Sequence, residues 1–529
     1  MIRSHLLLLA LASPAVADDL FQFTVPVKTA KAPSAAYLWL PPKAVQLRGI
    51  VVMGMTLAER EMVKDPILRK ACADEQLAIL FFKTGLGSVD LPAVLDDLAK
   101  ASNYAELRNA PLFFVGHSAG GPQALDLAMK YADRCFGLMQ YRGGHPMMQK
   151  EPLPPGITAL MMIGQFDEFG GVMRDDAGRE SWNKGWDSMH KFRKASAENL
   201  GSIVVEPGAG HFAWSEKNAE YFALFLKKAA RARIPQWNPD AKEPVKCAKV
   251  EAKSGWLTGM LAKTPEAAGI AADAEYKGEK DAAAWHFDKE MAEANEAYHK
   301  GHFGKKDQFL MWKSATTLDA GVRHYFNEVK WIGDGQTFVV QFAFAPTYPK
   351  PTPDDKGPKW NTAGEPAGNS GGANSVRLVG GPLVPTWANA LRIKFDALAP
   401  ATDPGRATFL AEAAETAEYR HTELVGMMPR GFAGLKAGKD QSVSFELPTE
   451  MKIGDELELK AVSDSGLPVE YYVSHGPARI EKGKLVVADV PSRANFPLEV
   501  KVVAYQFGRG VEPFVRTAVP VERTIKLVK

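Results

Sequence analysis

Residues 112–121 read LFFVGHSAGG, an apolar run that ends in a glycine-flanked serine. The run has the length of a buried strand, and the segment from Pro122 to Arg134 has the pattern of a helix. A serine at such a sharp strand-to-helix turn takes a strained backbone, for which Gly116 and Gly120 leave room. The turn lifts the hydroxyl above the sheet edge, where a base and a substrate carbonyl can both reach it. The stretch therefore predicts a nucleophile elbow at Ser118.

Strand-like and helix-like segments alternate on both sides of this turn, from Phe21 to about Trp237. The strands are continuous apolar runs and the segments between them are amphipathic, as in a mostly parallel sheet covered by helices on both faces. We therefore predict one doubly wound α/β domain over residues 18–237. Its predicted strands span residues 21–27, 36–40, 50–53, 77–82, 112–115, 136–141, 158–164 and 202–205. Its predicted helices span residues 61–76, 91–107, 122–134 and 216–233.

A serine hydroxyl is nearly inert at neutral pH and needs a nearby base that is itself oriented by a carboxylate. In this topology the acid follows a later strand and the histidine comes last. Asp167 lies just beyond the strand 158–164, and His211 lies in a glycine-rich loop after the strand 202–205. We assign Ser118 as the nucleophile, His211 as general base and then acid, and Asp167 as the orienting carboxylate.

Neighbouring acids and histidines compete for these roles. Glu168 is the alternative to Asp167, which we prefer because its shorter side chain sits one residue nearer the strand end. His145 follows the strand next to the elbow and is the rival base. His145 and Glu168 are also candidates for lining the substrate cleft, although a structural or surface role for His145 stays open. His117 is expected to pack or hydrogen-bond beneath the nucleophile.

The oxyanion that forms when the serine attacks needs two backbone N–H donors. Ala119, at the start of the elbow helix, should supply one of them. The loop after the third strand should supply the other. Met55 is our choice in that loop, within the sequence Met53-Gly54-Met55-Thr56.

The first residues have the features of a secretory signal peptide. A basic start precedes an apolar core from Leu6 to Leu11, and Ala15-Val16-Ala17 has the small-x-small pattern that a signal peptidase cuts. The apolar core is too short to serve as a stable membrane anchor. We therefore predict a signal peptide over residues 1–17, no transmembrane segment, and a periplasmic, secreted or cell-surface location.

Net charge and cysteine content limit which partners, disulfides and metal sites we expect. The formal net charge of +2 gives no electrostatic reason to expect nucleic acid as a partner. The three cysteines, Cys72, Cys135 and Cys247, allow at most one disulfide and lack metal-ligand spacing. His299 and His302 could place two imidazoles near one another, but no acid or cysteine at ligand spacing completes a site, so we expect a surface helix end. No metal or cofactor is predicted.

The pattern changes after Trp237, and a chain of 529 residues leaves room for further domains. We predict a mixed helical and β-rich middle domain over residues 245–437, with an exposed flexible loop over residues 347–374 that is rich in Pro, Gly, Asn and Asp. Short strands between turn signals then predict an immunoglobulin-like β-sandwich over residues 438–529. The clearest segments of the middle domain are a predicted helix over residues 280–300 and a predicted strand over residues 336–345.

Residues 21–237 resemble the α/β-hydrolase superfamily. The matching pieces are Gly116-His117-Ser118-Ala119-Gly120-Gly121, the turn Gly164-Gln165-Phe166-Asp167 and the loop Gly208-Ala209-Gly210-His211. The chain looks most like the small, cap-poor carboxylesterases of dienelactone-hydrolase-like and feruloyl- or acetyl-esterase-like kind. The resemblance implies ester hydrolysis through an acyl-serine intermediate, without a metal or organic cofactor.

Two departures accompany this resemblance. The Met53-Gly54-Met55 loop replaces the His-Gly-Gly sequence of many lipases, and serine stands where dienelactone hydrolases use cysteine. Only a short loop separates Tyr141 from Thr158, which implies an open cleft without an inserted lid. In the last domain, the sequence from Asp464 to Val469 resembles bacterial immunoglobulin-like repeats of cell-surface proteins.

These features lead us to expect an exported serine carboxylesterase. Its expected substrate is an ester, with acylated polysaccharides or related extracellular esters as the class, and its last domain is expected to contact the cell surface. Two alternatives stay open. One is a cell-surface protein that binds glycan or protein through a degenerate hydrolase domain, and the other is a serine peptidase. Triad candidates in the correct chain order favour the esterase.

Overall fold

The computed structural model describes most of the chain. The described residues are 20–28, 34–54, 57–143, 153–154, 156–164, 173–174, 180–181, 184–259, 269–299, 305–313, 318–319, 323–326, 328–347, 365–387, 389–428, 432 and 434–529. The predicted signal peptide of residues 1–17 therefore lies outside the described residues. Among the described helices, none combines the length and the apolar character that crossing a bilayer would require.

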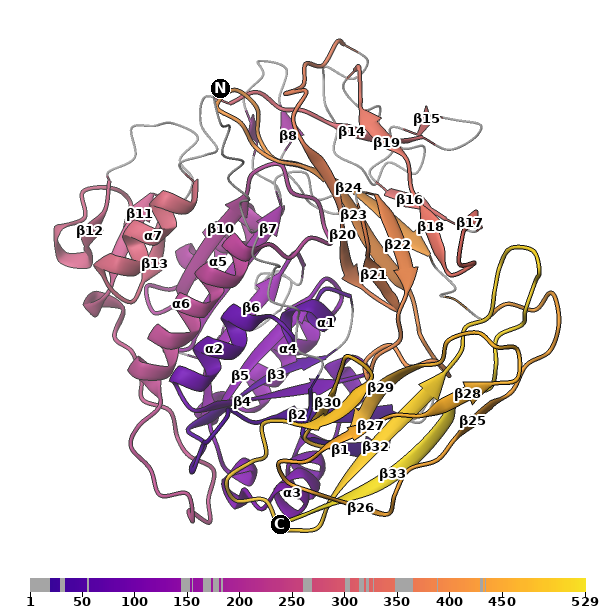
Figure 1. The fold of residues 1–529 in the computed structure, drawn as a ribbon. Helices are drawn as coiled ribbons and strands as arrows, with labels where there is room; N and C mark the ends of the chain where they lie inside the picture. Colours follow the sequence, from indigo (N-terminus) through magenta and orange to yellow (C-terminus); the bar gives the residue numbers. More distant parts are fainter. Residues whose placement is uncertain are drawn as a thin grey trace, which may run out of the picture.

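An eight-stranded sheet forms the centre of the first half, in the order β1-β2-β4-β3-β5-β6-β7-β10 (Figure 1). The pairs β1–β2 and β2–β4 are antiparallel, and every other pair is parallel. All residues of β3 to β7 and β10 are buried, which explains why these strands are continuous apolar runs. The strands are β1 (Phe23–Val27), β2 (Ser34–Trp39), β3 (Gly49–Gly54), β4 (Leu77–Phe82), β5 (Leu112–His117), β6 (Cys135–Tyr141), β7 (Thr158–Gly164) and β10 (Leu200–Glu206). The predicted mostly parallel α/β sheet is confirmed.

Among the described residues, six α-helices lie between or after these strands in the sequence. They are α1 (Glu59–Met62), α2 (Pro66–Asp74), α3 (Leu91–Ser102), α4 (Gly120–Lys130), α5 (Lys184–Ala195) and α6 (Glu216–Arg233). The prediction of one helix over residues 61–76 is wrong, because Asp65 accepts hydrogen bonds from two backbone N–H groups and starts a new helix with Pro66. The helix predicted over residues 91–107 ends early, since Asn103 takes a left-handed conformation with φ of 63°.

The second half begins with a small layer at the β10 edge. The strands β11 (Trp256–Gly259), β12 (Ala271–Ala272) and β13 (Ala283–His286) form a sheet, followed by α7 (Lys289–His299). The helix predicted over residues 280–300 is therefore partly wrong, because its first part is the apolar strand β13. His299 does not lie on the surface as expected. It is buried, and its Nε2 accepts the N–H of Val205 at 3.1 Å.

Small sheets make up the rest of the middle region. Two of them have four strands each, in the orders β16-β24-β23-β20 and β17-β18-β22-β21, and a third has the order β15-β14-β19. The strand predicted over residues 336–345 is split between two of these sheets, as β18 and β19. The strands are β14 (Leu310–Lys313), β15 (Leu318–Asp319), β16 (Arg323–Tyr325), β17 (Trp331–Ile332), β18 (Thr337–Val339), β19 (Phe342–Phe344), β20 (Asn374–Gly380), β21 (Leu383–Pro385), β22 (Ala390–Ile393), β23 (Ala407–Ala413) and β24 (Thr422–Met428).

The last part of the chain forms three more small sheets, β25-β28, β26-β33-β32-β29 and β27-β31-β30. Nearly all of their pairings are antiparallel, which is compatible with the predicted β-sandwich. The immunoglobulin-like assignment stays a prediction. The strands are β25 (Val443–Phe445), β26 (Glu450–Lys452), β27 (Glu456–Glu458), β28 (Ala461–Ser463), β29 (Glu470–His475), β30 (Ala478–Glu481), β31 (Lys484–Val487), β32 (Leu498–Tyr505) and β33 (Val521–Val528).

The two halves share a hydrophobic core. Leu410 of β23 and Val425 and Met427 of β24 belong to the same buried cluster as Val51 and Phe81 of the central sheet. Figure 1 shows the sheet of β20, β23 and β24 beside the upper end of the central sheet, and the last sheets beside β1 and β2. All three cysteines are free, so the one disulfide that the sequence allows is not formed. Of the predicted flexible loop 347–374, residues 348–364 lie outside the described residues.

Candidate active site

The turn between β5 and α4 has the geometry of a nucleophile elbow. Ser118 follows β5 with a positive φ of 53°, a conformation that costs a non-glycine residue on the order of 1–3 kcal/mol. A Cβ on Gly116 would lie 2.1 Å from the Gly120 carbonyl oxygen, so the turn can close only with glycine there. The Ser118 N–H donates to the Tyr141 carbonyl oxygen at 3.0 Å, which fixes the turn to the end of the neighbouring strand β6.

His117 supports this turn from below. Its ring is buried, its Nδ1 accepts the N–H of Ala58 at 3.4 Å, and its Nε2 lies 2.9 Å from the His211 carbonyl oxygen. These partners require the proton on Nε2, so that Nε2 donates to that carbonyl. Burial, and then the charge of His211, lowers the pKa of His117 well below its ordinary value, so the ring stays neutral. The expectation that His117 hydrogen-bonds beneath the serine is confirmed.

Glu59 ties the loop after β3 to the elbow, a role that the sequence analysis did not predict. One of its carboxylate oxygens accepts the His117 N–H at 2.8 Å, and the other accepts the Leu57 N–H at 2.9 Å. The carboxylate is buried. It therefore holds Leu57 close to His117 at the end of β5. Met55 itself lies outside the described residues, whereas Ala119 is described and is exposed at the start of α4, where helix N–H groups lack intrahelical partners.

The histidine loop, which we define as residues 207–214, leaves β10 and meets the elbow. His211 is only 2% exposed, and its ring centroid lies 4.9 Å from that of His117. The structure therefore brings the residue before Ser118 and the predicted base together at the carboxyl ends of β5 and β10. The turn that carries the predicted acid starts at the same edge, because Gly164 pairs with Glu206 in the parallel register of β7 and β10. Asp167, Glu168 and His145 lie outside the described residues.

A buried ion pair inside the sheet edge was also missed by the sequence analysis. Arg142 follows β6, and its guanidinium donates to the Glu206 carboxylate and to the Gly210 carbonyl oxygen. Glu206 also accepts the Ser215 hydroxyl at 2.5 Å and the Asn218 amide at 2.6 Å. With every charge paired, these contacts fix both ends of the histidine loop to the central sheet. The sequence shows that Arg142 follows an apolar strand, but its partner Glu206 is identified only from the fold.

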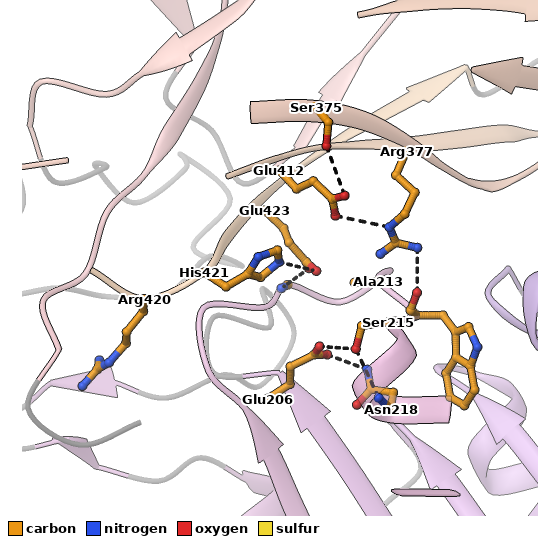
Figure 2. A network of polar contacts seen from close by, with 12 residues as sticks. Glu206, Ala213, Ser215, Asn218, Ser375, Arg377, Glu412, Arg420, His421 and Glu423 are labelled. Carbon is orange, nitrogen blue, oxygen red and sulfur yellow. Dashed lines mark hydrogen bonds and ion pairs between the residues drawn. The ribbon is translucent and has the colours of Figure 1, made fainter. Parts of the chain in front are cut away.

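The second half of the chain contacts the histidine loop from outside (Figure 2). Glu423, at the start of β24, has a fully buried side chain and accepts the Gly210 N–H at 3.0 Å through Oε2. Its Oε1 lies 3.1 Å from His421 Nε2. Arg377 of β20 donates to the Trp214 carbonyl oxygen at 2.6 Å and also pairs with Glu61. A sheet from far along the chain therefore lies against the histidine loop.

A cavity of about 750 Å³ lies beside these contacts, between the end of the histidine loop and the sheet of β20, β23 and β24. Its wall combines an aromatic ring with charged groups of both signs. The lining includes Glu61, Trp214, Arg377, Glu412, His421 and Glu423.

Three of these residues could share a metal ion by position alone. The ligand atoms of Glu412, His421 and Glu423 all lie within 4.8 Å of one another. Both oxygens of Glu412 are already used, by Ser375 and by Arg377. Burial lowers the pKa of His421, but the hydrogen bond and charge of Glu423 outweigh it and raise that pKa above its ordinary value. Because these carboxylates already accept from Ser375, Arg377 and His421, the arrangement favours an ion-pair network over a metal site.

No protein-family model matches the chain, and no curated protein matches its sequence. Among solved structures, the chain is similar to the esterase domain of a Rhodothermus marinus protein, with 16% identity over 39% of this chain and 97% of that one, at a TM-score of 0.27. It is also similar to an α/β serine hydrolase without lid from Xanthomonas campestris, with 15% identity over 41% of this chain and 96% of that one, at a TM-score of 0.27. An S-formylglutathione hydrolase from Agrobacterium tumefaciens matches with 13% identity over 39% of this chain and 94% of that one, at a TM-score of 0.28. Each of these matches covers about two-fifths of this chain.

Proposed function

We propose that residues 18–237 form a serine hydrolase that cleaves carboxylic esters. The observation that carries the proposal is the strained turn at Ser118, with φ of 53°, next to a buried histidine loop whose His211 carbonyl oxygen is bound by the ring of His117. A serine held in this conformation beside a histidine is the arrangement that nucleophilic acyl transfer requires.

The proposed mechanism has two halves. His211 takes the proton of the Ser118 hydroxyl while the serine oxygen attacks the ester carbonyl carbon, and Asp167 orients the imidazole. The tetrahedral oxyanion accepts hydrogen bonds from the N–H groups of Ala119 and Met55. The protonated imidazole then gives its proton to the departing alcohol, leaving an acyl-serine. Water, deprotonated by the same histidine, attacks the acyl group, and the serine regains its proton as the acid leaves.

The finer parts of the proposal extend this mechanism. Glu168 is the alternative acid, and His145 is proposed to line the cleft. We propose export to the periplasm or cell surface, with acylated polysaccharides or related extracellular esters as substrates. These parts are supported by the N-terminal sequence and by the β-rich second half, which we propose also contacts the cell surface.

The first prediction tests the nucleophile. Ser118→Ala should lower kcat on short p-nitrophenyl esters by on the order of 10³-fold or more, because the residues of a triad act as a unit. The same variant should lose covalent labelling by a fluorophosphonate probe, and His211→Ala should label far more slowly. The matched control is Ser254→Ala, an exposed serine whose hydroxyl bonds only locally, to the Glu251 carbonyl oxygen.

Ester hydrolysis that survives in Ser118→Ala would contradict the mechanism. A wild-type protein that neither labels nor hydrolyses esters would instead favour the alternative of a binding protein with a degenerate hydrolase domain. Cleavage of peptides in place of esters, lost in Ser118→Ala, would favour the peptidase.

A further inference from the structure

The loop that carries His211 is held at the residue directly before it by charged groups from two distant parts of the chain. The Gly210 carbonyl oxygen accepts from Arg142, at the end of β6, and the Gly210 N–H donates to Glu423, at the start of β24. Both side chains are buried, so neither contact competes with bulk water. Arg142 directly follows a strand of the central sheet, whereas Glu423 lies 213 positions after Gly210.

A second contact from the same distant sheet lies on the other side of His211. Arg377 of β20 donates to the Trp214 carbonyl oxygen at 2.6 Å. Figure 2 shows Arg377 and Glu423 facing the segment that carries Ala213 and Ser215. The histidine is thus bracketed, at positions 210 and 214, by two hydrogen bonds from the second half of the chain.

The histidine loop and the segment just before β24 are in main-chain contact. Gly208 has a φ of 75°, and a Cβ on it would lie only 1.4 Å from the His421 carbonyl oxygen. The main chain at His421, just before β24, therefore contacts the histidine loop at Gly208, where no side chain fits. This contact, together with the positive φ, explains the glycine at position 208.

We propose that the sheet of β16, β24, β23 and β20 is a structural part of the active site and that Glu423 is a positioning residue for His211. This inference rests on the proposed function. Glu423 touches neither the substrate nor the reacting atoms and acts through the Gly210 peptide. A general base must be held within a few tenths of an ångström of its productive position, and small displacements caused from outside the chemistry can cost about 10²-fold in rate.

The test compares variants of the full chain on a p-nitrophenyl ester. Glu423→Ala should lower kcat by about tenfold or more with KM within twofold of wild type, since substrate contacts are untouched. Glu423→Gln should recover most of the rate, because its amide oxygen can still accept the Gly210 N–H. The control is Glu418→Ala, which removes an exposed carboxylate from the same β23–β24 connection, where it pairs only with exposed Lys306.

A second readout is independent of catalysis. Hydrogen exchange of the peptide spanning residues 206–214 should speed up in Glu423→Ala and stay at the wild-type rate in Glu418→Ala. Glu423→Asp, which keeps the charge but shortens the reach, covers the case in which Glu423→Ala does not fold, and it too should lose kcat at constant KM.

The outcomes separate this inference from the proposed function. If the wild type labels at Ser118 and hydrolyses esters, but Glu423→Ala and Glu423→Asp keep kcat within twofold of Glu418→Ala, the positioning role is wrong and the esterase stands. If the wild type is inactive and unlabelled, the proposed function fails, and faster exchange confined to residues 206–214 still supports the role of Glu423 in holding the loop. Unchanged exchange in Glu423→Ala overturns that role in either case.

Discussion

At the scale of single residues, the carboxyl group of Glu61 connects the two halves of the chain. Glu61 accepts from Arg377 at 2.8 Å through Oε1, whereas its Oε2 is buried and meets no hydrogen-bond donor among the described residues. Burial raises the pKa of Glu61 to about 8, against the opposing charge of Arg377. Glu61 is therefore protonated at neutral pH and gives up its proton as the medium becomes basic.

The raised pKa predicts a stability change with pH. The folded state holds the Glu61 proton up to about pH 8, whereas the unfolded chain releases it near the ordinary value of 4.5. The stabilisation from this group is therefore fully present below pH 4.5 and is lost as the pH rises to 8. Glu61→Gln, which mimics the protonated form, should match wild type at pH 5 and exceed its free energy of unfolding by about 2 kcal/mol or more at pH 9, since each pKa unit is worth about 1.4 kcal/mol.

Urea denaturation at the two pH values measures this difference. Glu293→Gln, an exposed partner of Lys289, is the control and should change stability equally at both. A constant difference between Glu61→Gln and wild type from pH 5 to pH 9 would refute the assignment.

At the scale of elements, the histidine loop and β24 are packed backbone to backbone. The loop leaves β10 in the central sheet, and the start of β24 lies against it at Gly208. Polar contacts at Gly210 and Trp214 then continue the same interface. Because both partners are main chain, neither can yield to an added side chain by changing a rotamer.

Gly208→Ala tests this packing. The new Cβ would overlap the His421 carbonyl oxygen, so the variant should lose β24 from the loop, with a kcat loss of at least tenfold and a clear fall in Tm. The matched control is Gly466→Ala, where φ is 77° but nothing lies within 4 Å of the added Cβ. The control should lose only the free energy of unfolding that a left-handed alanine costs, about 1–2 kcal/mol, and keep its kcat. Equal effects of the two substitutions on kcat would show that the contact with β24 is unimportant.

At the scale of the whole molecule, a shared hydrophobic core and ion pairs join the two halves of the chain. Leu410, Val425 and Met427 share a buried cluster with the central sheet. Ion pairs cross the same boundary, between Lys64 and Asp396 at 2.9 Å and between Arg493 and Glu106 at 2.9 Å. Shared core is the usual source of cooperative unfolding, so the first half is not expected to melt by itself.

Calorimetry should therefore record one unfolding transition that contains both halves. Val425→Ala, which removes two buried methyl groups from the shared cluster, should lower the free energy of unfolding by about 2 kcal/mol and move the whole transition. Val462→Ala, at a side chain that is 68% exposed, should have an effect within about 0.5 kcal/mol. Two separate transitions, only one of which responds to Val425→Ala, would contradict this coupling.

Local features of this protein could be predicted from its sequence. Apolar runs predicted the strands β4 and β7, and an amphipathic segment predicted the helix α6, all with their observed bounds. These signals are local, because strand and helix periodicity depend on neighbours within a few residues. The predicted helix over residues 61–76 was wrong because Asp65 and Pro66 form a helix start inside it.

Which distant groups meet depends on how the whole chain folds. Nothing near Glu423, Arg377 or Arg142 in the sequence distinguishes them from solvent-exposed charges, because their partners lie tens to hundreds of positions away. Their burial and pairing exist only once the sheet of β20 and β24 has packed on the edge that carries His211. A charge acquires its role from the low-dielectric surroundings that folding builds around it, and a linear pattern does not encode those surroundings.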